Sequence, residues 1–118
     1  MVRLRRYEPD HNPNYFEMSY GLSNNDINNI QSVFNKFPAI EQAILYGSRA
    51  KGNFKNSSDI DIALKGKGID LSLLASINSQ LDDLIIPYKV DLFLFDRIKN
   101  RDLIDHINRV GKRIYNRA

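Results

Sequence analysis

The sequence contains no cysteine and only two histidines among its 118 residues. Without cysteine there is no disulfide framework, no thiolate metal site and no cysteine nucleophile, and two histidines argue against a zinc site. Long apolar runs are also missing: the longest, such as residues 92–95, fall far short of the roughly 18–20 residues that cross a bilayer. No apolar segment follows the arginine-rich N-terminus, which argues against a secretory signal. We therefore expect a cytoplasmic protein that does not bind membranes.

The composition predicts one folded domain. Hydrophobic residues make up 42% of the chain and charged residues 26%, which is enough apolar material for a core, and we place the domain at residues 22–118. Residues 1–21 mix arginines, aromatics, asparagines and prolines without a helical or strand period, so we expect a flexible tail there. The alternative is an aromatic and basic arm that docks on a partner or on nucleic acid. A net charge of +3 is weak evidence for nucleic-acid binding, and we expect no direct contact with nucleic acid.

Apolar periodicity and turn residues predict alternating helices and strands after residue 22. Ser23, Asp70 and Asn100 stand where helix N-caps are expected, each before apolar residues at helical spacing. The expected elements are a helix at 24–37, strands at 42–46 and 59–65, a helix from 71 to the proline at 87, a strand at 88–95, a helix at 101–109 and a short edge strand at 113–115. This order predicts an α/β (α+β) fold, with a small mixed β-sheet flanked by helices.

Three aspartates stand on two of the expected strands. Asp59 and Asp61 are two residues apart, so both side chains should project from one face while Ile60 and Ile62 point into the core. Asp91 lies between apolar residues of the next strand, where burying an unpaired acid is costly. Carboxylates held this close repel one another unless a hard cation neutralises them, and Mg²⁺ binds such oxygens together with substrate phosphates. The pattern predicts a two-metal site for phosphoryl transfer.

A turn that ends a strand precedes these aspartates in the sequence. The strand at 42–46 ends at Gly47 and Ser48, where a glycine permits a tight turn and the close approach of a ligand to the backbone. Free N–H groups and the Ser48 hydroxyl can hold a phosphate there, particularly where a short helix begins. Arg49 adds positive charge beside the turn. The turn and the carboxylates together suit a nucleoside triphosphate bound with Mg²⁺.

The combined pattern resembles the signature of the DNA polymerase β-like nucleotidyltransferase superfamily. The Gly-Ser turn is followed after ten residues by the Asp-x-Asp pair, and Asp91 comes later on a further strand. The run at 47–52 is most similar to the minimal nucleotidyltransferases (MNT proteins), which are often encoded beside a helical HEPN protein as antitoxin and toxin. The resemblance covers residues 22–118 and implies the nucleotidyltransferase fold. Lys51 stands where many relatives carry arginine, a departure that keeps the charge.

The resemblance also implies a role for each of these residues. Asp59 and Asp61 would hold both Mg²⁺ ions, and Asp91 would share the catalytic ion and help to activate the attacking hydroxyl. The Gly-Ser turn, assisted by Arg49, would bind the triphosphate of ATP. Attack at the α-phosphate would transfer AMP and release pyrophosphate. In MNT proteins the acceptor would be a tyrosine hydroxyl of the HEPN toxin, and the transfer would neutralise the toxin's ribonuclease.

Two other functions stay open at this point. A nucleotidyltransferase could act on a small molecule such as an aminoglycoside, or on an RNA end, although such enzymes usually carry a further domain that holds the acceptor. A non-catalytic antitoxin could instead neutralise its toxin by binding alone.

The remaining features have simpler explanations. Residues 97–118 carry more lysine and arginine than aspartate, which a solvated helix face would explain; a patch for RNA or for an acidic partner surface is the alternative. His106 is expected at the surface or boundary of the last helix, and His11 in the tail, neither with an evident partner.

Overall fold

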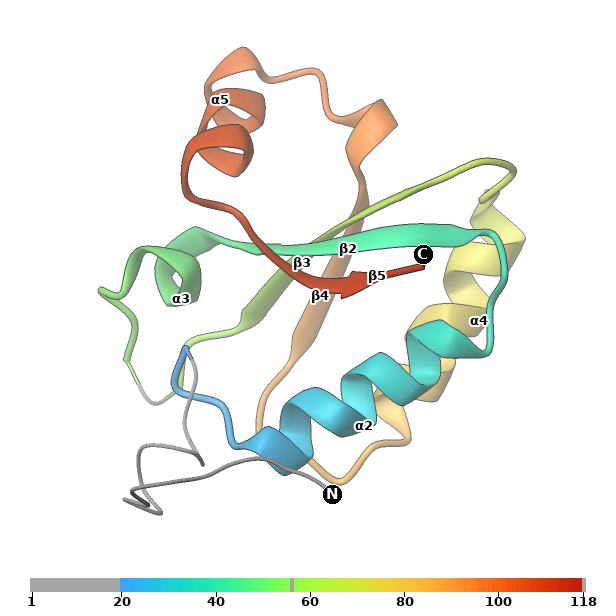
Figure 1. Ribbon diagram of the computed structural model, residues 1–118, viewed down its shortest axis with the longest axis horizontal. Coiled ribbons are helices and arrows are strands. Elements are labelled where there is room, and N and C mark those ends of the chain that lie inside the picture. Colours follow the sequence, from blue (N-terminus) through green and yellow to red (C-terminus); the bar gives the residue numbers. More distant parts are fainter. Residues whose placement is uncertain (1–19, 56, 118) are drawn as a thin grey trace.

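The computed structural model describes residues 20–55 and 57–117 and shows a four-stranded sheet with helices on both faces (Figure 1). The strand order is β4-β3-β2-β5, with β3 and β4 parallel and the other two pairings antiparallel. The expected fold class, a small mixed sheet flanked by helices, is therefore confirmed. The elements in chain order are α2 (Asn24–Asn35), β2 (Ile40–Tyr46), α3 (Gly47–Lys51), β3 (Ile60–Gly66), α4 (Leu71–Asp82), β4 (Val90–Leu94), the 3₁₀ turn η1 (Phe95–Arg97), α5 (Arg101–Val110) and β5 (Lys112–Asn116).

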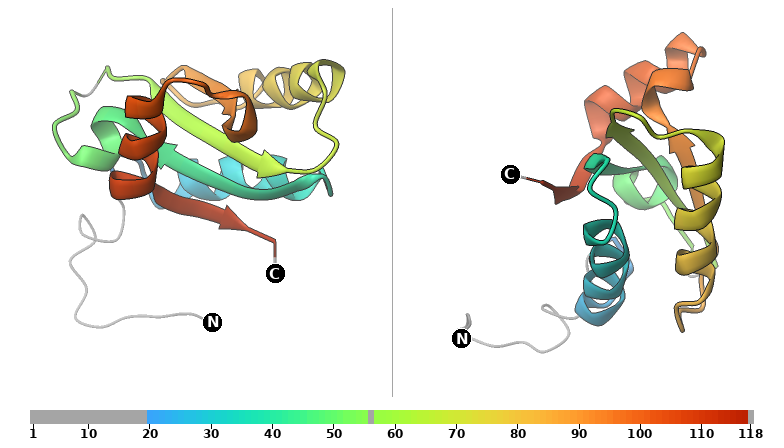
Figure 2. Two further views of the ribbon diagram at one scale, coloured as in Figure 1. Left: turned by 90° about the horizontal axis from the view of Figure 1, so that it is seen from above. Right: turned by 90° about the vertical axis from the view of Figure 1, so that its right-hand side faces the viewer.

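Alternation along β3 divides the molecule into two apolar layers. Ile60, Ile62 and Leu64 are buried in the main core with side chains of α2 and α4, which cover one face of the sheet (Figures 1 and 2). Ala63 faces the other way, into a smaller cluster beneath α5 that includes Ile107. Successive side chains of a strand point to opposite faces, so this alternation leaves Asp61 on the side of α5.

All three expected N-caps are present. The Ser23 hydroxyl accepts the N–H of Asp26 at 3.0 Å, and the side chains of Asp70 and Asn100 accept N–H groups three residues ahead in α4 and α5. Each cap satisfies a donor that the first turn of a helix leaves without an intrahelical partner. The starts of the three long helices are thus set by local sequence.

Several element ends differ from the expectation by a few residues. The helix expected to reach the proline at 87 stops at Asp82, so Ile85, whose spacing fits the apolar stripe of the expected helix, lies beyond it and is 98% exposed instead of facing the core. β3 begins at Ile60 and leaves Asp59 immediately before the strand, and β4 begins at Val90 rather than at residue 88.

The expected tail falls outside the described residues, apart from Tyr20, which packs against the main core, and the glycine after it. Within the described residues, no helix has the length and apolar character needed to cross a membrane.

Candidate active site

Three polar side chains form a row across β2, β3 and β4. Tyr46 is the register partner of Asp61 across the antiparallel pair β2–β3, and Asp61 is the partner of Asp91 across the parallel pair β3–β4. Side chains at directly opposed positions of neighbouring strands project from the same face, with Cβ atoms about 5 Å apart. Tyr46 also belongs to the apolar cluster beneath α5. The row therefore lies on the face that α5 covers, and Asp59 stands exposed at its border, immediately before β3.

Burial and the charges of Asp91, Asp59 and His106 together shift the pKa of Asp61. Burial raises the pKa of Asp61 above its ordinary value, and repulsion from Asp91 and from Asp59 raises it further, whereas His106 acts in the opposite direction. Burial, followed by the charges of Asp61 and Asp91, raises the pKa of Tyr46 to about 12. An ionised Asp61 thus stands in a negative and partly dehydrated environment, which a cation would relieve.

The turn at Gly47 fits closely against Asp61. Gly47 has a φ of 76° and opens α3 directly after the last residue of β2. A Cβ atom at this position would come within 2.5 Å of Oδ2 of Asp61, so any other residue would displace the carboxylate or the turn. Ser48 follows as the second residue of α3 and is partly exposed. The expected Gly-Ser turn therefore lies beside the expected carboxylates.

His106 joins the site from α5. The backbone N–H of Gly47 donates to its Nε2 at 2.9 Å, and its ring meets the Tyr46 ring edge-on with centroids 6.2 Å apart. The expectation that His106 has no partner was therefore wrong. Gly47 and His106 are 59 residues apart, and no local spacing relates them; the only available signal is that a histidine on the sheet-facing side of a short helix needs a polar partner.

Arg49 contacts backbone carbonyls and aromatic rings of the protein, whereas the sequence led us to expect a contact with the triphosphate. Its side chain is 1% exposed; Nε and Nη2 donate to the carbonyl of Ser58 at 3.1 and 2.8 Å, and Nη1 donates to the carbonyl of Tyr20 at 2.9 Å. The guanidinium also lies over the rings of Tyr88 and Phe54, at 4.4 and 5.1 Å from their centroids. Arg49 therefore ties α3 to the loop that ends at the Asp-x-Asp pair.

The carboxylates suit a magnesium ion by the chemistry of their atoms. Among residues 20–55 and 57–117, no three His, Asp or Glu side chains are gathered so that they could hold an ion as they stand. Asp61 and Asp91 nevertheless offer hard oxygen donors on adjacent strands, and the raised pKa of Asp61 reflects repulsion that a divalent cation would remove. Lys89, whose Nζ lies 3.5 Å from Oδ1 of Asp91, supplies positive charge at the exposed border.

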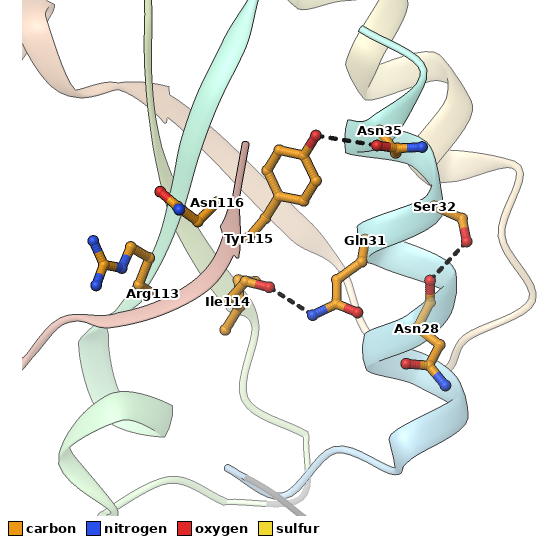
Figure 3. Close-up of a pocket in the computed structure, with 8 residues that line it drawn as sticks. All are labelled: Asn28, Gln31, Ser32, Asn35, Arg113, Ile114, Tyr115 and Asn116. Atoms are coloured by element: carbon orange, nitrogen blue, oxygen red, sulfur yellow. Dashed lines mark hydrogen bonds between the residues drawn. The ribbon is translucent and has the colours of Figure 1, made fainter. Parts of the chain in front are cut away.

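A polar pocket of about 530 Å³ lies away from this row, between α2 and β5 at the opposite edge of the sheet (Figure 3). Its side chains are engaged within the protein: Gln31 donates to the carbonyl of Ile114 at 2.7 Å, and the Tyr115 hydroxyl meets Asn35 at 3.4 Å. The residues of this pocket include none of those expected to form the site. The size of this pocket therefore does not identify it as the active site.

Several solved structures with a similar fold come from toxin–antitoxin pairs. One is a toxin–antitoxin complex with AMP-PNP, with a TM-score of 0.63 and 22% identity over 77% of this chain and 73% of that chain. A mutant of the MntA–HpeT toxin–antitoxin pair matches with a TM-score of 0.61 and 19% identity, over 77% and 73% of the two chains. A tri-AMPylated Shewanella oneidensis HEPN toxin in complex with MNT antitoxin gives a TM-score of 0.58 and 20% identity, over 78% and 71%.

Sequence comparison covers most of the folded part. No curated protein matches the sequence significantly. Residues 28–118 match the family model described as "Polymerase beta, Nucleotidyltransferase", a span that contains the Gly-Ser turn, all three aspartates and His106. The chain belongs to the polymerase beta nucleotidyltransferase family.

Proposed function

We propose that this chain uses Mg²⁺ to transfer AMP from ATP to a hydroxyl group of a HEPN-family toxin, a tyrosine hydroxyl in particular, and thereby acts as the antitoxin. The observation that carries the proposal is the register of Asp61 with Asp91, next to the turn at Gly47. Membership of the nucleotidyltransferase family supports the reaction class. The toxin–antitoxin neighbours, one with AMP-PNP and one with an AMPylated HEPN toxin, support the choice of nucleotide and acceptor.

Each residue has an assigned part in the proposed reaction. Asp59, Asp61 and Asp91 would hold Mg²⁺, which when bound neutralises phosphate charge. Gly47 and Ser48 would bind the triphosphate beside these carboxylates. The acceptor hydroxyl oxygen forms a bond to the α-phosphorus and gives up its proton with the help of Asp91, while the bond from the α-phosphorus to the bridging oxygen breaks and pyrophosphate leaves.

We assign Arg49 a positioning role in place of the direct triphosphate contact expected from the sequence. Its bonds to the carbonyl of Ser58 hold the residue immediately before Asp59, so the guanidinium supports the metal-binding loop from inside the protein. A planar group with several donors suits this task, because it can meet carbonyls on two segments at once.

The test uses ATP radiolabelled at the α-phosphate, Mg²⁺ and the product of the neighbouring gene, which the proposal expects to be a HEPN protein. We expect label on a tyrosine of the HEPN protein and loss of its ribonuclease activity. Asp59→Ala/Asp61→Ala should abolish transfer, and Asp91→Asn should slow it by about 100-fold or more. Asp82→Asn, an exposed acid at the end of α4, is the matched control and should transfer at the wild-type rate.

Three results contradict the proposal. If the wild-type protein transfers no label while the double variant still neutralises the toxin, the chain acts by binding alone. Label on an RNA end, or on an aminoglycoside, would assign a different acceptor. If Asp91→Asn is as fast as the wild type, the role of the third carboxylate is wrong.

A further inference from the structure

An apolar groove of about 350 Å³ runs along the edge of the sheet formed by β4. Two of the three exposed large hydrophobic side chains among the described residues lie in it, Leu71 at 67% and Phe93 at 49% exposure; the third, Ile85, does not. Its lining comes from α4, β4, η1, the loop after η1 and the start of α5, and includes Leu71, Leu74, Phe93, Arg97, Lys99 and Leu103. Exposed apolar side chains gathered in one hollow are typical of a surface that binds a partner.

The groove begins beside the candidate active site. Phe93 follows Asp91 by two residues on β4, so both side chains project from the same face of the sheet. β4 pairs with β3 on one side and is the last strand at this edge among the described residues. A molecule bound in the groove would therefore lie next to the carboxylates, at the edge of the sheet that β4 forms.

The charges of the groove favour an acidic occupant. Arg97 and Lys99 line it and are exposed, and its lining contains no carboxylate; Asp70 and Asp96 lie in the adjoining hollow, which Arg97 also lines. These two residues belong to the basic segment 97–118, whose lysines and arginines the nucleotidyltransferase site does not use. Apolar side chains at the centre of a contact and charges at its rim are the usual arrangement of a protein–protein interface.

On the basis of the function proposed above, we propose that this groove docks an apolar segment of the acceptor protein that carries acidic residues at its flank. Docking there holds the acceptor next to Asp91, so its hydroxyl reaches the α-phosphate of a bound nucleotide. Leu71 and Phe93 supply the apolar contact, and Arg97 and Lys99 select for the acidic flank and set the direction of the segment.

The test separates docking from the chemistry of the site. Leu71→Ser/Phe93→Thr removes the exposed apolar contacts, and Ile85→Thr removes an equally apolar, more exposed side chain outside the groove. Isothermal titration calorimetry measures AMP-PNP binding with Mg²⁺, and radiolabel transfer at varied concentrations of the proposed HEPN acceptor, the product of the neighbouring gene, gives kcat and KM. For the double variant we expect KM for the acceptor to rise about tenfold or more, with AMP-PNP affinity and kcat unchanged. Ile85→Thr should match the wild type in every measurement.

Charge reversal tests the acidic flank. Arg97→Glu/Lys99→Glu should weaken HEPN binding by about tenfold and remove most of its salt dependence. Lys112→Glu, an exposed cation on β5 at the other edge of the sheet, should leave both unchanged.

The possible failures are distinguishable. If the wild-type protein binds the HEPN protein and groove variants lose this binding but no AMP is transferred, the proposed function fails and the groove stands. If transfer occurs and the groove variants equal Ile85→Thr, the groove proposal is overturned. It is also overturned by a wild-type homodimer that dissociates on Leu71→Ser/Phe93→Thr, by nuclear Overhauser contacts between the Phe93 ring and residues 1–19, or by an RNA oligonucleotide that binds through Arg97 and Lys99.

Discussion

The backbone N–H of Gly47 donates a hydrogen bond to Nε2 of His106, and this bond of 2.9 Å joins α5 to the turn beside Asp61. The bond also satisfies a backbone donor that would otherwise lie beneath α5 without a partner. His106 therefore fixes the place of the turn that we assign to the triphosphate.

Replacing His106 should weaken nucleotide binding without unfolding the protein. His106→Leu removes the acceptor, and leaving the Gly47 N–H unpaired costs about 1–2 kcal/mol, so we expect AMP-PNP affinity with Mg²⁺ to fall by roughly 5- to 30-fold. His106→Gln keeps an acceptor at similar reach and should restore most of the affinity. Isothermal titration calorimetry provides the measurement, and the amide resonance of Gly47 reports the bond directly. Equal loss in both variants would show that the ring's packing, and not the bond, matters.

Removing Lys89 should strengthen metal binding. Its ammonium lies 3.5 Å from a carboxylate oxygen of Asp91 at the exposed border of the site, where it competes with a cation for that oxygen. Exposed ion pairs contribute up to about 1 kcal/mol, so Lys89→Met should raise Mg²⁺ affinity by roughly two- to fivefold at low salt. The gain should shrink as ionic strength rises. Lys67→Met, which removes an exposed lysine in the turn after β3, is the control; an equal gain there would indicate a general charge effect.

The meeting of Asp61 with Asp91 was accessible from sequence because strands have a strict period of two. Once the two strands are neighbours, that period decides which side chains share a face, and apolar residues on either side of each aspartate fix the phase. The N-caps were equally local, since each rests on one side chain and an N–H three residues ahead. The roles that the family implies for the aspartates stay predictions.

What the sequence could not provide depends on contacts between distant segments. The bond from Gly47 to His106 exists only because β2 and α5 pack together. From the sequence, Arg49 is one more cation beside the turn, but its side chain is buried and donates hydrogen bonds to the carbonyls of Tyr20 and Ser58. Ile85 fitted the helical stripe, yet the helix ends three residues before it. In each case tertiary packing, rather than local spacing, determines the outcome.

Arg49→Lys should destabilise the protein despite keeping the charge. A lysine has one ammonium group in place of a planar fork, so it cannot reach both the Ser58 and Tyr20 carbonyls and lie flat over the Tyr88 ring. We expect the free energy of unfolding to fall by about 2–4 kcal/mol, as for other disrupted buried polar networks. Urea denaturation measures this loss. Lys51→Arg, at an exposed position of the same helix, should leave stability within about 0.5 kcal/mol of the wild type. If Arg49→Lys is equally stable but loses AMP-PNP affinity, the residue contacts the nucleotide after all.

Tyr46 should ionise at a higher pH than an ordinary tyrosine, and its titration reports the charge of the carboxylate pair. Its pKa is raised from 10.0 to about 12, by burial first and then by Asp61 and Asp91. The unfolded chain loses this proton near its ordinary pKa while the native protein keeps it, so the stabilising effect is complete below pH 10 and is lost as the pH rises through about 12. Tyrosinate absorbance should show a late step that Tyr46→Phe removes and Tyr115→Phe retains. Asp91→Asn should move that step to lower pH, because one of the two repelling charges is gone; a step that does not move would show that the charge of Asp91 does not act on Tyr46.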